Sequence, residues 1–273
     1  MATYVNVRVN GGISVISAFA EGHGASIGIE LPMDIEMSYG KSGNVPEITN
    51  FFKERYSLEK GFYINVRSSI PQGMGLKSSS ALVIGITAGI NKITEYFNNT
   101  GDLLKEGSKV SRELKLSRTG AMDDLACCLM GGLCYADNRN EVFIERWEPE
   151  PVNVLILPGS GKRSSYEISG QDLSPYADRY QDMCRRLNEK EFFRIMVENG
   201  DIMSEVTGID RKKLKLLKET GPLAASQSGK GEAMFAIYES REKAIRAKEI
   251  MEKMNYAAIL TRTSNLPLNV EVK

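Results

Sequence analysis

The feature that most constrains this chain is a run of glycines and serines at residues 71–81, Pro-Gln-Gly-Met-Gly-Leu-Lys-Ser-Ser-Ser-Ala. Before it, residues 62–66 show the period-two alternation of a half-buried strand. After Ser78, apolar residues recur every three or four positions as far as Phe97, which predicts a long helix. The glycine- and serine-rich segment must therefore turn a strand into a helix.

This junction carries the groups that bind an anion. Gly73 and Gly75 allow backbone conformations closed to other residues and let a ligand approach the main chain. A helix N-terminus adds free N–H groups and the positive end of the helix dipole. A turn followed by a serine cap is the plainer interpretation, but two glycines, a lysine and three serines exceed what a cap needs. The predicted phosphate-binding residues are Pro71, Gln72, Gly73, Met74, Gly75, Leu76, Lys77, Ser78, Ser79, Ser80 and Ala81.

Other glycine clusters give weaker signals. Residues 22–28 precede a strand-like stretch rather than a helix. Residues 159–163 resemble the end of a Walker loop, but Ile156 stands in place of its first glycine and Arg163 in place of its metal-binding hydroxyl. Residues 226–232 precede a predicted strand and by themselves are a flexible loop as readily as a site.

Two adjacent carboxylates, Asp123 and Asp124, stand at the start of a predicted helix over residues 122–130. Acidic residues favour the first turn of a helix for structural reasons alone. The local sequence therefore supports a capping role and a catalytic role for Asp123 equally.

Strands and helices occur in both halves of the chain, which indicates an α+β or α/β fold. The residues Pro149-Glu150-Pro151 suggest a hinge, and we expect domains over residues 1–149 and 150–273. We expect residues 268–272 to close the sheet of the second half. The other elements expected in that half are strands at 152–157, 233–238 and 256–261 and helices at 176–198, 211–218 and 241–254.

Charge and composition exclude several classes of protein. The 273 residues include 35 Lys and Arg against 35 Asp and Glu, so the formal net charge is zero. Such a balance argues against nucleic acid or a membrane surface as a partner. The most apolar stretch, residues 81–90, is half of the roughly 20 residues that a membrane span needs. Without a recognisable secretory signal, we expect a cytoplasmic protein. The four cysteines form no CxxC pair and fit a buried, reduced state: Cys127, Cys128, Cys134 and Cys184.

Taken together, the motifs resemble those of the GHMP kinase superfamily, named for galactose, homoserine, mevalonate and phosphomevalonate kinases. The pattern P-x-x-x-G-L-x-S-S-[AS] matches residues 71–80, and G-x-x-D-[NQD] matches residues 120–124. A third, glycine-rich motif matches residues 226–231, with Ser226 where glycine is commoner. Within the superfamily, the lysine before three serines and the stretch 12–31 are similar to the archaeal-type shikimate kinases.

The resemblance implies an α+β GHMP kinase fold, with an N-terminal domain like ribosomal protein S5 domain 2 and a C-terminal ferredoxin-like domain. It implies ATP-dependent phosphorylation of shikimate with Mg²⁺, in a site between the domains. Asp123 would be catalytic, and Ser79 and Glu113 would bind the metal. The third motif would add Ser228, Gly229 and Gly231 to the nucleotide site.

The carboxylate of shikimate needs a cation, for which Lys162, Arg163 and Arg262 are candidates, although each is also an ordinary surface charge. His23, the one histidine, lies in a glycine-rich stretch and is expected to be a turn residue or a neighbour of the substrate loop. The sequence offers no metal partners for it.

The phosphate-loop and aspartate motifs equally fit a homoserine or mevalonate kinase, and only the family-specific stretches favour shikimate. An inactive ligand sensor with this fold is a further alternative, against which intact Gly73, Ser79 and Asp123 argue. The motifs do not reveal the oligomeric state.

Overall fold

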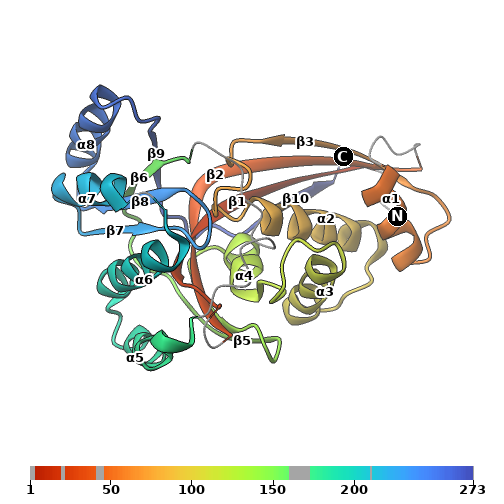
Figure 1. Cartoon of the computed structure of the whole chain (residues 1–273). Coiled ribbons are helices and arrows are strands. Elements are labelled where there is room, and N and C mark those ends of the chain that lie inside the picture. Colours follow the sequence, from red (N-terminus) through yellow and green to blue (C-terminus); the bar gives the residue numbers. More distant parts are fainter. Residues whose placement is uncertain (1–3, 20–21, 41–45, 160–172, 210, 273) are drawn as a thin grey trace.

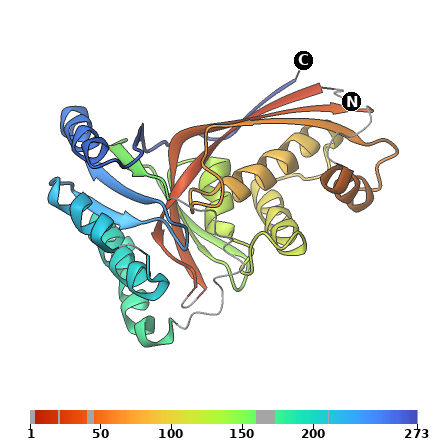
Figure 2. The same cartoon turned by 45° about the horizontal axis from the view of Figure 1, so that its top comes forward.

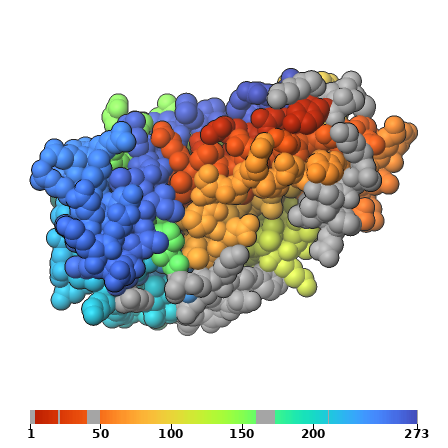
Figure 3. All heavy atoms as spheres, turned by 90° about the horizontal axis from the view of Figure 1, so that it is seen from above, coloured from red at the N-terminus to blue at the C-terminus, as the bar shows by residue number. Residues whose placement is uncertain are grey.

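The computed structural model describes residues 4–19, 22–40, 46–159, 173–209 and 211–272. These residues form two antiparallel sheets with helices packed on them (Figure 1). In the view of Figure 3 the molecule is elongated, with the second half of the chain at one end. Within the described residues, no helix combines the length and apolar character that crossing a membrane requires.

The first sheet has six strands in the order β10-β1-β2-β4-β5, with β3 also paired to β2. Residues 27–31 and 35–37 belong to the single long strand β2. Strand β1 continues to Ile16 through a bulge next to Gly11. The bounds are β1 (Tyr4–Ile16), β2 (His23–Tyr39), β3 (Phe62–Ser68), β4 (Leu133–Asp137), β5 (Val142–Trp147) and β10 (Asn269–Val272).

Four helices belong to the first half: α1 (Pro46–Arg55), α2 (Ser78–Thr94), α3 (Thr100–Glu113) and α4 (Met122–Met130). The helix predicted after Ser78 is α2, whose buried side chains face the first sheet. Figure 2 shows α2 and α3 side by side beneath that sheet. Helix α4 lies in the middle of the molecule and contacts both β1 and β2, which brings the start of α4 close to the start of α2.

The second half forms a four-stranded sheet in the order β7-β8-β6-β9. Along the described part of the chain, strand β6 is followed by three α-helices, strands β7 and β8, helix α8 and strand β9. This is the ferredoxin-like arrangement that the resemblance implies, with three helices in place of the first one. The helix predicted at 176–198 is two helices, α5 and α6, separated by residues 188–191. The bounds are β6 (Asn153–Leu157), a short 3-10 helix (Ser174–Tyr176), α5 (Ala177–Leu187), α6 (Phe192–Thr207), α7 (Arg211–Glu219), β7 (Ala224–Gln227), β8 (Met234–Tyr238), α8 (Arg241–Lys253) and β9 (Ile259–Arg262).

The last strand corrects one expectation. Residues 268–272 were expected to close the second sheet, but β10 pairs with β1 of the first sheet, with Val272 opposite Val5. Ser264 N–H donates a hydrogen bond to the Gly28 carbonyl of β2 (2.8 Å), and this contact directs the chain after β9 toward the first sheet. An unpaired edge of β1 would expose backbone N–H and C=O groups, and β10 satisfies them.

One hydrophobic core runs through both halves. It joins residues of the first sheet and α2 to Val154, Phe235 and the buried side of α6. A smaller core behind the second sheet holds α7 and α8. Helix α6 contacts both β7 and β1, and the Asn199 side-chain oxygen of α6 accepts a hydrogen bond from Ser17 N–H (2.9 Å). The segment that follows β1 is thereby held beside the second half.

Candidate active site

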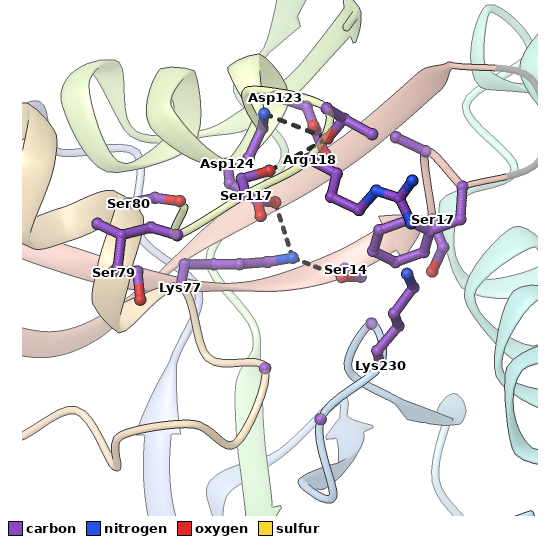
Figure 4. A pocket seen from close by; sticks show the side chains of 18 of the residues that line it. Ser14, Ser17, Lys77, Ser79, Ser80, Ser117, Arg118, Asp123, Asp124 and Lys230 are labelled. Carbon is purple, nitrogen blue, oxygen red and sulfur yellow. Dashed lines mark hydrogen bonds and ion pairs between the residues drawn. The ribbon is translucent and has the colours of Figure 1, made fainter. Parts of the chain in front are cut away.

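A cavity of about 470 Å³ lies where the two halves meet. Its walls come from the end of β1 and the residues after it, the β3–α2 junction, the loop before α4, the first turn of α4 and the loop after β7. Figure 4 shows its polar side chains pointing inward from these elements. The residues that line it include Ser14, Ser17, Phe19, Gly73, Gly75, Lys77, Ser78, Ser79, Ser80, Arg118, Asp123, Asp124, Gly229, Lys230 and Gly231.

The start of α2 is built to receive an anion. Gly73 and Gly75 have positive φ angles of 69° and 83°, which glycine adopts at little cost. Lys77 stands before the first turn with φ 64°, and its side chain does not cap the helix. Ser78, Ser79 and Ser80 line the cavity, and the first turn contains no acidic residue. The free N–H groups and the dipole of this helix therefore favour a negatively charged ligand.

The loop after β7 holds the junction in shape. Ser228 donates its hydroxyl hydrogen to the Gly75 carbonyl (2.7 Å). Ala233 N–H donates to the Met74 carbonyl (3.1 Å). The two backbones touch so closely that a Cβ on Gly231 would lie 2.1 Å from the Met74 carbonyl carbon. The second half thus clamps the phosphate-binding candidate of the first.

Asp123, in the first turn of α4, is the most buried carboxylate of the cavity, with 4% of its surface exposed. Its two oxygens accept hydrogen bonds from Ser26 Oγ (3.0 Å) and Asn138 Nδ2 (2.9 Å). Burial, and then the charge of Asp124, raise the pKa of Asp123 to about 7, against the opposing effect of Lys77 and the two hydrogen bonds. A carboxylate with a pKa near neutrality can take up and release a proton under physiological conditions.

Lys77 links this carboxylate pair to β1. Its Nζ lies 2.7 Å from Asp124 Oδ1 and donates to Ser14 Oγ at 2.6 Å. Burial disfavours the ammonium form, but the charges of Asp124 and Asp123 outweigh it and raise the pKa of Lys77 above its ordinary value. Lys77 therefore stays charged, midway between the start of α2 and the start of α4 (Figure 4).

A second cavity, of about 330 Å³, opens from the same junction. It shares Gln72, Gly73, Ser78 and Ser79 with the first cavity, and side chains of β2, β3 and α2 form an apolar wall. These wall residues are Met33, Ile64, Val66, Leu82 and Ile86. An apolar slot beside an anion site suits a flat ring attached to phosphate groups.

The structure brings together most of the predicted site residues. Those in the cavity wall are Gln72, Gly73, Gly75, Lys77, Ser78, Ser79, Ser80, Asp123, Gly229 and Gly231. Leu76 and Ala81 are instead fully buried in the core. Pro71 and Met74 are half-buried outside the wall, and Ser228 stands behind it as a bridge between Ser14 and Gly75.

Glu113 does not reach the cavity. It is the last residue of α3, and its carboxylate accepts a hydrogen bond from Arg55 Nη1 of α1 (2.6 Å). Among the described residues, no group of three or more histidine, cysteine or acidic side chains is placed to hold a metal ion.

Of the cations expected to bind a substrate carboxylate, Arg262 does not line the cavity. Arg262, at the end of β9, is exposed and donates to the Pro151 carbonyl (3.4 Å). Lys162 and Arg163 fall outside the described residues. His23 faces Tyr135, whose hydroxyl lies 3.0 Å from His23 Nδ1, and it does not line the cavity.

Sequence reasoning missed two cations that do line it, Arg118 and Lys230. Lys230 was visible only as a residue of the third motif, and Arg118 carried no signal beyond its place five residues before Asp123.

Comparisons with known proteins agree with this geometry. Residues 44–132 match the family model described as the GHMP kinases N terminal domain. A shikimate kinase of Thermoplasma acidophilum is 31% identical over 94% of this chain and 97% of its own length. One from Thermococcus kodakarensis is 28% identical over 85% of this chain and 91% of its own.

Among solved structures, a homoserine kinase from Cytophaga hutchinsonii superposes with a TM-score of 0.77. The comparison covers 99% of this chain and 98% of that one, at 16% identity. A likeness at this identity establishes the fold, while the sequence relatives establish the branch. The chain belongs to the archaeal-type shikimate kinase family within the GHMP kinase superfamily.

Proposed function

We propose that the protein transfers the γ-phosphoryl group of ATP to the 3-hydroxyl of shikimate. One observation carries the proposal: buried Asp123 faces the same cavity as the uncapped N-terminus of α2, with Lys77 between them. This arrangement offers a proton acceptor, an anion site and a bridging positive charge in one enclosed space. The sequence relatives supply the substrate, since they are shikimate kinases over nearly the whole chain.

In this proposal the triphosphate binds the start of α2. The backbone N–H groups at Ser78–Ser80, the serine hydroxyls and the glycines of both loops receive its oxygens. The adenine ring occupies the apolar second cavity, which joins the first at Gly73 and Ser79. Gly229 and Gly231 close the other side of the phosphates.

Asp123 accepts the proton of the attacking hydroxyl. As the oxygen bonds to the γ-phosphorus, the bond to the bridging oxygen of ADP breaks, and the proton passes to the Asp123 carboxylate. The products are shikimate 3-phosphate and ADP. Phosphoryl transfer depends mainly on positioning and charge neutralisation, and Lys77 supplies a fixed positive charge beside the reacting groups.

Magnesium fits this site through a small set of protein oxygens. Mg²⁺ is commonly held by substrate phosphates and water with one or two protein ligands, and Ser79 presents a hydroxyl at the cavity wall. When bound, the ion would neutralise part of the triphosphate charge. Glu113 would have to leave Arg55 to contribute a second ligand.

The remaining alternatives act on other acceptors or on none. A coupled assay for ADP release with shikimate, homoserine and mevalonate in parallel separates them. Turnover with shikimate is the expected result. Turnover with homoserine or mevalonate alone would contradict the substrate, and ATP binding without turnover of any acceptor would favour a ligand sensor. As a shikimate kinase, the protein would act in cytoplasmic chorismate biosynthesis.

A further inference from the structure

Lys230 is a buried cation that has no acidic partner in the part of the chain that the structure describes. Only 6% of its surface is exposed. Its Nζ lies 3.5 Å from the centre of the Phe19 ring, and among the described residues no carboxylate or carbonyl is hydrogen-bonded to it. A buried ammonium with only an aromatic ring as partner costs free energy. The position of Lys230 therefore suits interaction with a ligand that enters the cavity.

A second cation lies beside it. Arg118, from the loop before α4, lines the same cavity and is close enough for its charge to act on Lys230. Burial, and then Arg118, lower the pKa of Lys230 to about 8. Two neighbouring positive charges repel each other, and an anion between them would remove the repulsion.

The hydroxyl of Ser17, at the same end of the cavity, is unsatisfied. The Ser17 hydroxyl is buried and makes no hydrogen bond with any described residue, although Ser17 N–H is held by Asn199. An unpaired buried hydroxyl costs free energy unless a ligand or water completes it. Ser17 and Lys230 therefore place two unsatisfied polar groups in one part of the cavity, beside the positive charge of Arg118.

Their place in the cavity separates them from the phosphate site. Figure 4 shows Arg118, Ser17 and Lys230 on one side, Ser79 and Ser80 on the other, and Lys77 with the aspartates between. A phosphate chain on α2 lies on the serine side. The hydroxyl that attacks the terminal phosphate must lie near Asp123. The rest of the acceptor molecule therefore extends toward Arg118 and Lys230.

We propose that Lys230, Arg118 and Ser17 form the binding site for the carboxylate of the acceptor substrate. The inference rests on the proposed function, which makes that acceptor shikimate. Arg118 provides a forked donor suited to a carboxylate, Lys230 a point charge, and Ser17 a hydroxyl donor. The site thereby selects acceptors that carry an anion at the end opposite the reacting hydroxyl.

The test compares shikimate with its methyl ester, which has the same hydroxyl groups but no carboxylate charge. For the wild-type enzyme we expect kcat/KM to be at least about 100-fold higher for shikimate, as for the loss of a charged hydrogen-bond partner at two donors. In Lys230→Met and in Arg118→Gln we expect this preference to shrink by about tenfold or more, with KM for ATP nearly unchanged. Ser17→Ala should have a smaller effect in the same direction.

Two controls sharpen the comparison. Lys215→Met removes an exposed lysine of α7 and should leave the preference unchanged. Arg262→Gln tests the rival cation on β9, and loss of the preference there would overturn the proposal. Because Arg118 is exposed, Arg118→Gln is expected to fold even if the buried Lys230 does not tolerate substitution.

The outcomes separate the two proposals. Equal wild-type turnover of shikimate and its methyl ester, or an unchanged preference in Arg118→Gln and in folded Lys230→Met, overturns the carboxylate site while leaving the kinase activity standing. Absence of wild-type turnover with shikimate contradicts the proposed function itself.

Discussion

The Lys77 ammonium lies 2.7 Å from the Asp124 carboxylate, so the residue before α2 is bonded to the first turn of α4. This contact joins the phosphate-binding candidate to the catalytic candidate. Because Ser26 Oγ donates to Asp124 (2.6 Å) and also lies 3.0 Å from Asp123, the bridge continues to β2. The two helix starts therefore act as one unit.

Replacing Lys77 should lower the free energy of unfolding, because it removes the contact between the starts of α2 and α4. In Lys77→Met, Asp124 loses its partner while partly buried, and breaking such a pair costs about 3 kcal/mol. Chemical denaturation should show that loss in the free energy of unfolding. The double variant with Asp124→Asn should recover part of it, because no unpaired charge remains. Equal stability of Lys77→Met and the wild type would contradict the bridge.

Removing the proton acceptor should reduce turnover. In Asp123→Asn we expect kcat to fall by about 100-fold or more, as for loss of a general base, while KM for ATP changes little. The amide oxygen can still accept the hydrogen bond from Asn138, and the amide NH2 can donate to Ser26 Oγ in place of the other hydrogen bond. Asp178→Asn, at an exposed first turn of α5, is the matched control. Wild-type turnover in folded Asp123→Asn would rule out the assigned role.

The pH dependence of kcat/KM for shikimate should be bell-shaped. Asp123 must be ionised to accept a proton, and its pKa of about 7 places the rising limb there. Lys230 must be charged to bind the carboxylate, and its pKa of about 8 places the falling limb there. Asp124 and Lys77 face the first group, and Arg118 faces the second. Lys230→Met should remove only the alkaline limb; a falling limb that persists in it would show that another group is responsible.

The close contact between the loop after β7 and the β3–α2 junction should be sensitive to one added methyl group. In Gly231→Ala the new Cβ would collide with the Met74 backbone, so the phosphate junction must shift. We expect KM for ATP to rise by about tenfold, as for a modest misplacement of binding groups. Gly208→Asn, in open space with a φ that asparagine tolerates, serves as the control. An unchanged KM in Gly231→Ala would mean that this contact does not shape the nucleotide site.

The dependence of turnover on Mg²⁺ concentration should change when Ser79 is replaced and not when Glu113 is replaced. Ser79→Ala should increase the Mg²⁺ concentration needed for half-maximal turnover, because the hydroxyl lines the cavity. Glu113→Gln should leave it nearly unchanged, since that carboxylate pairs with Arg55. Titration of Mg²⁺ at fixed ATP measures both. The reverse order of effects would restore Glu113 as the metal ligand.

Local patterns predicted the parts of the site that depend on short stretches of chain. The change of periodicity at Ser78 located the start of α2, and Met122–Met130 was predicted with its observed bounds. Both depend on side chains a few residues apart. The single strand β2 was harder to predict, because its two parts differ in burial. Residues 24–29 are all buried, whereas burial alternates over residues 30–37, and the strand continues without a break between them.

Long-range pairing accounts for what the sequence did not reveal. A short strand such as β10 fits any open sheet edge, and its choice of β1 depends on where Ser264 is held. Arg118 and Lys230 are 112 residues apart in the chain and meet only through the packing of the two halves. The resemblance implied that Glu113 binds the metal, but the direction of α3 turns its side chain toward Arg55.

The central claim is that this cavity transfers phosphate from ATP to the 3-hydroxyl of shikimate. The most direct measurement is phosphorus NMR of the product after incubation of the wild-type protein with ATP, Mg²⁺ and shikimate. We expect one phosphomonoester, coupled to the proton on carbon 3 and formed in equal amount to ADP, and its near absence with Asp123→Asn. ADP formed without a shikimate phosphoester, or a phosphoester on another hydroxyl, would contradict the claim.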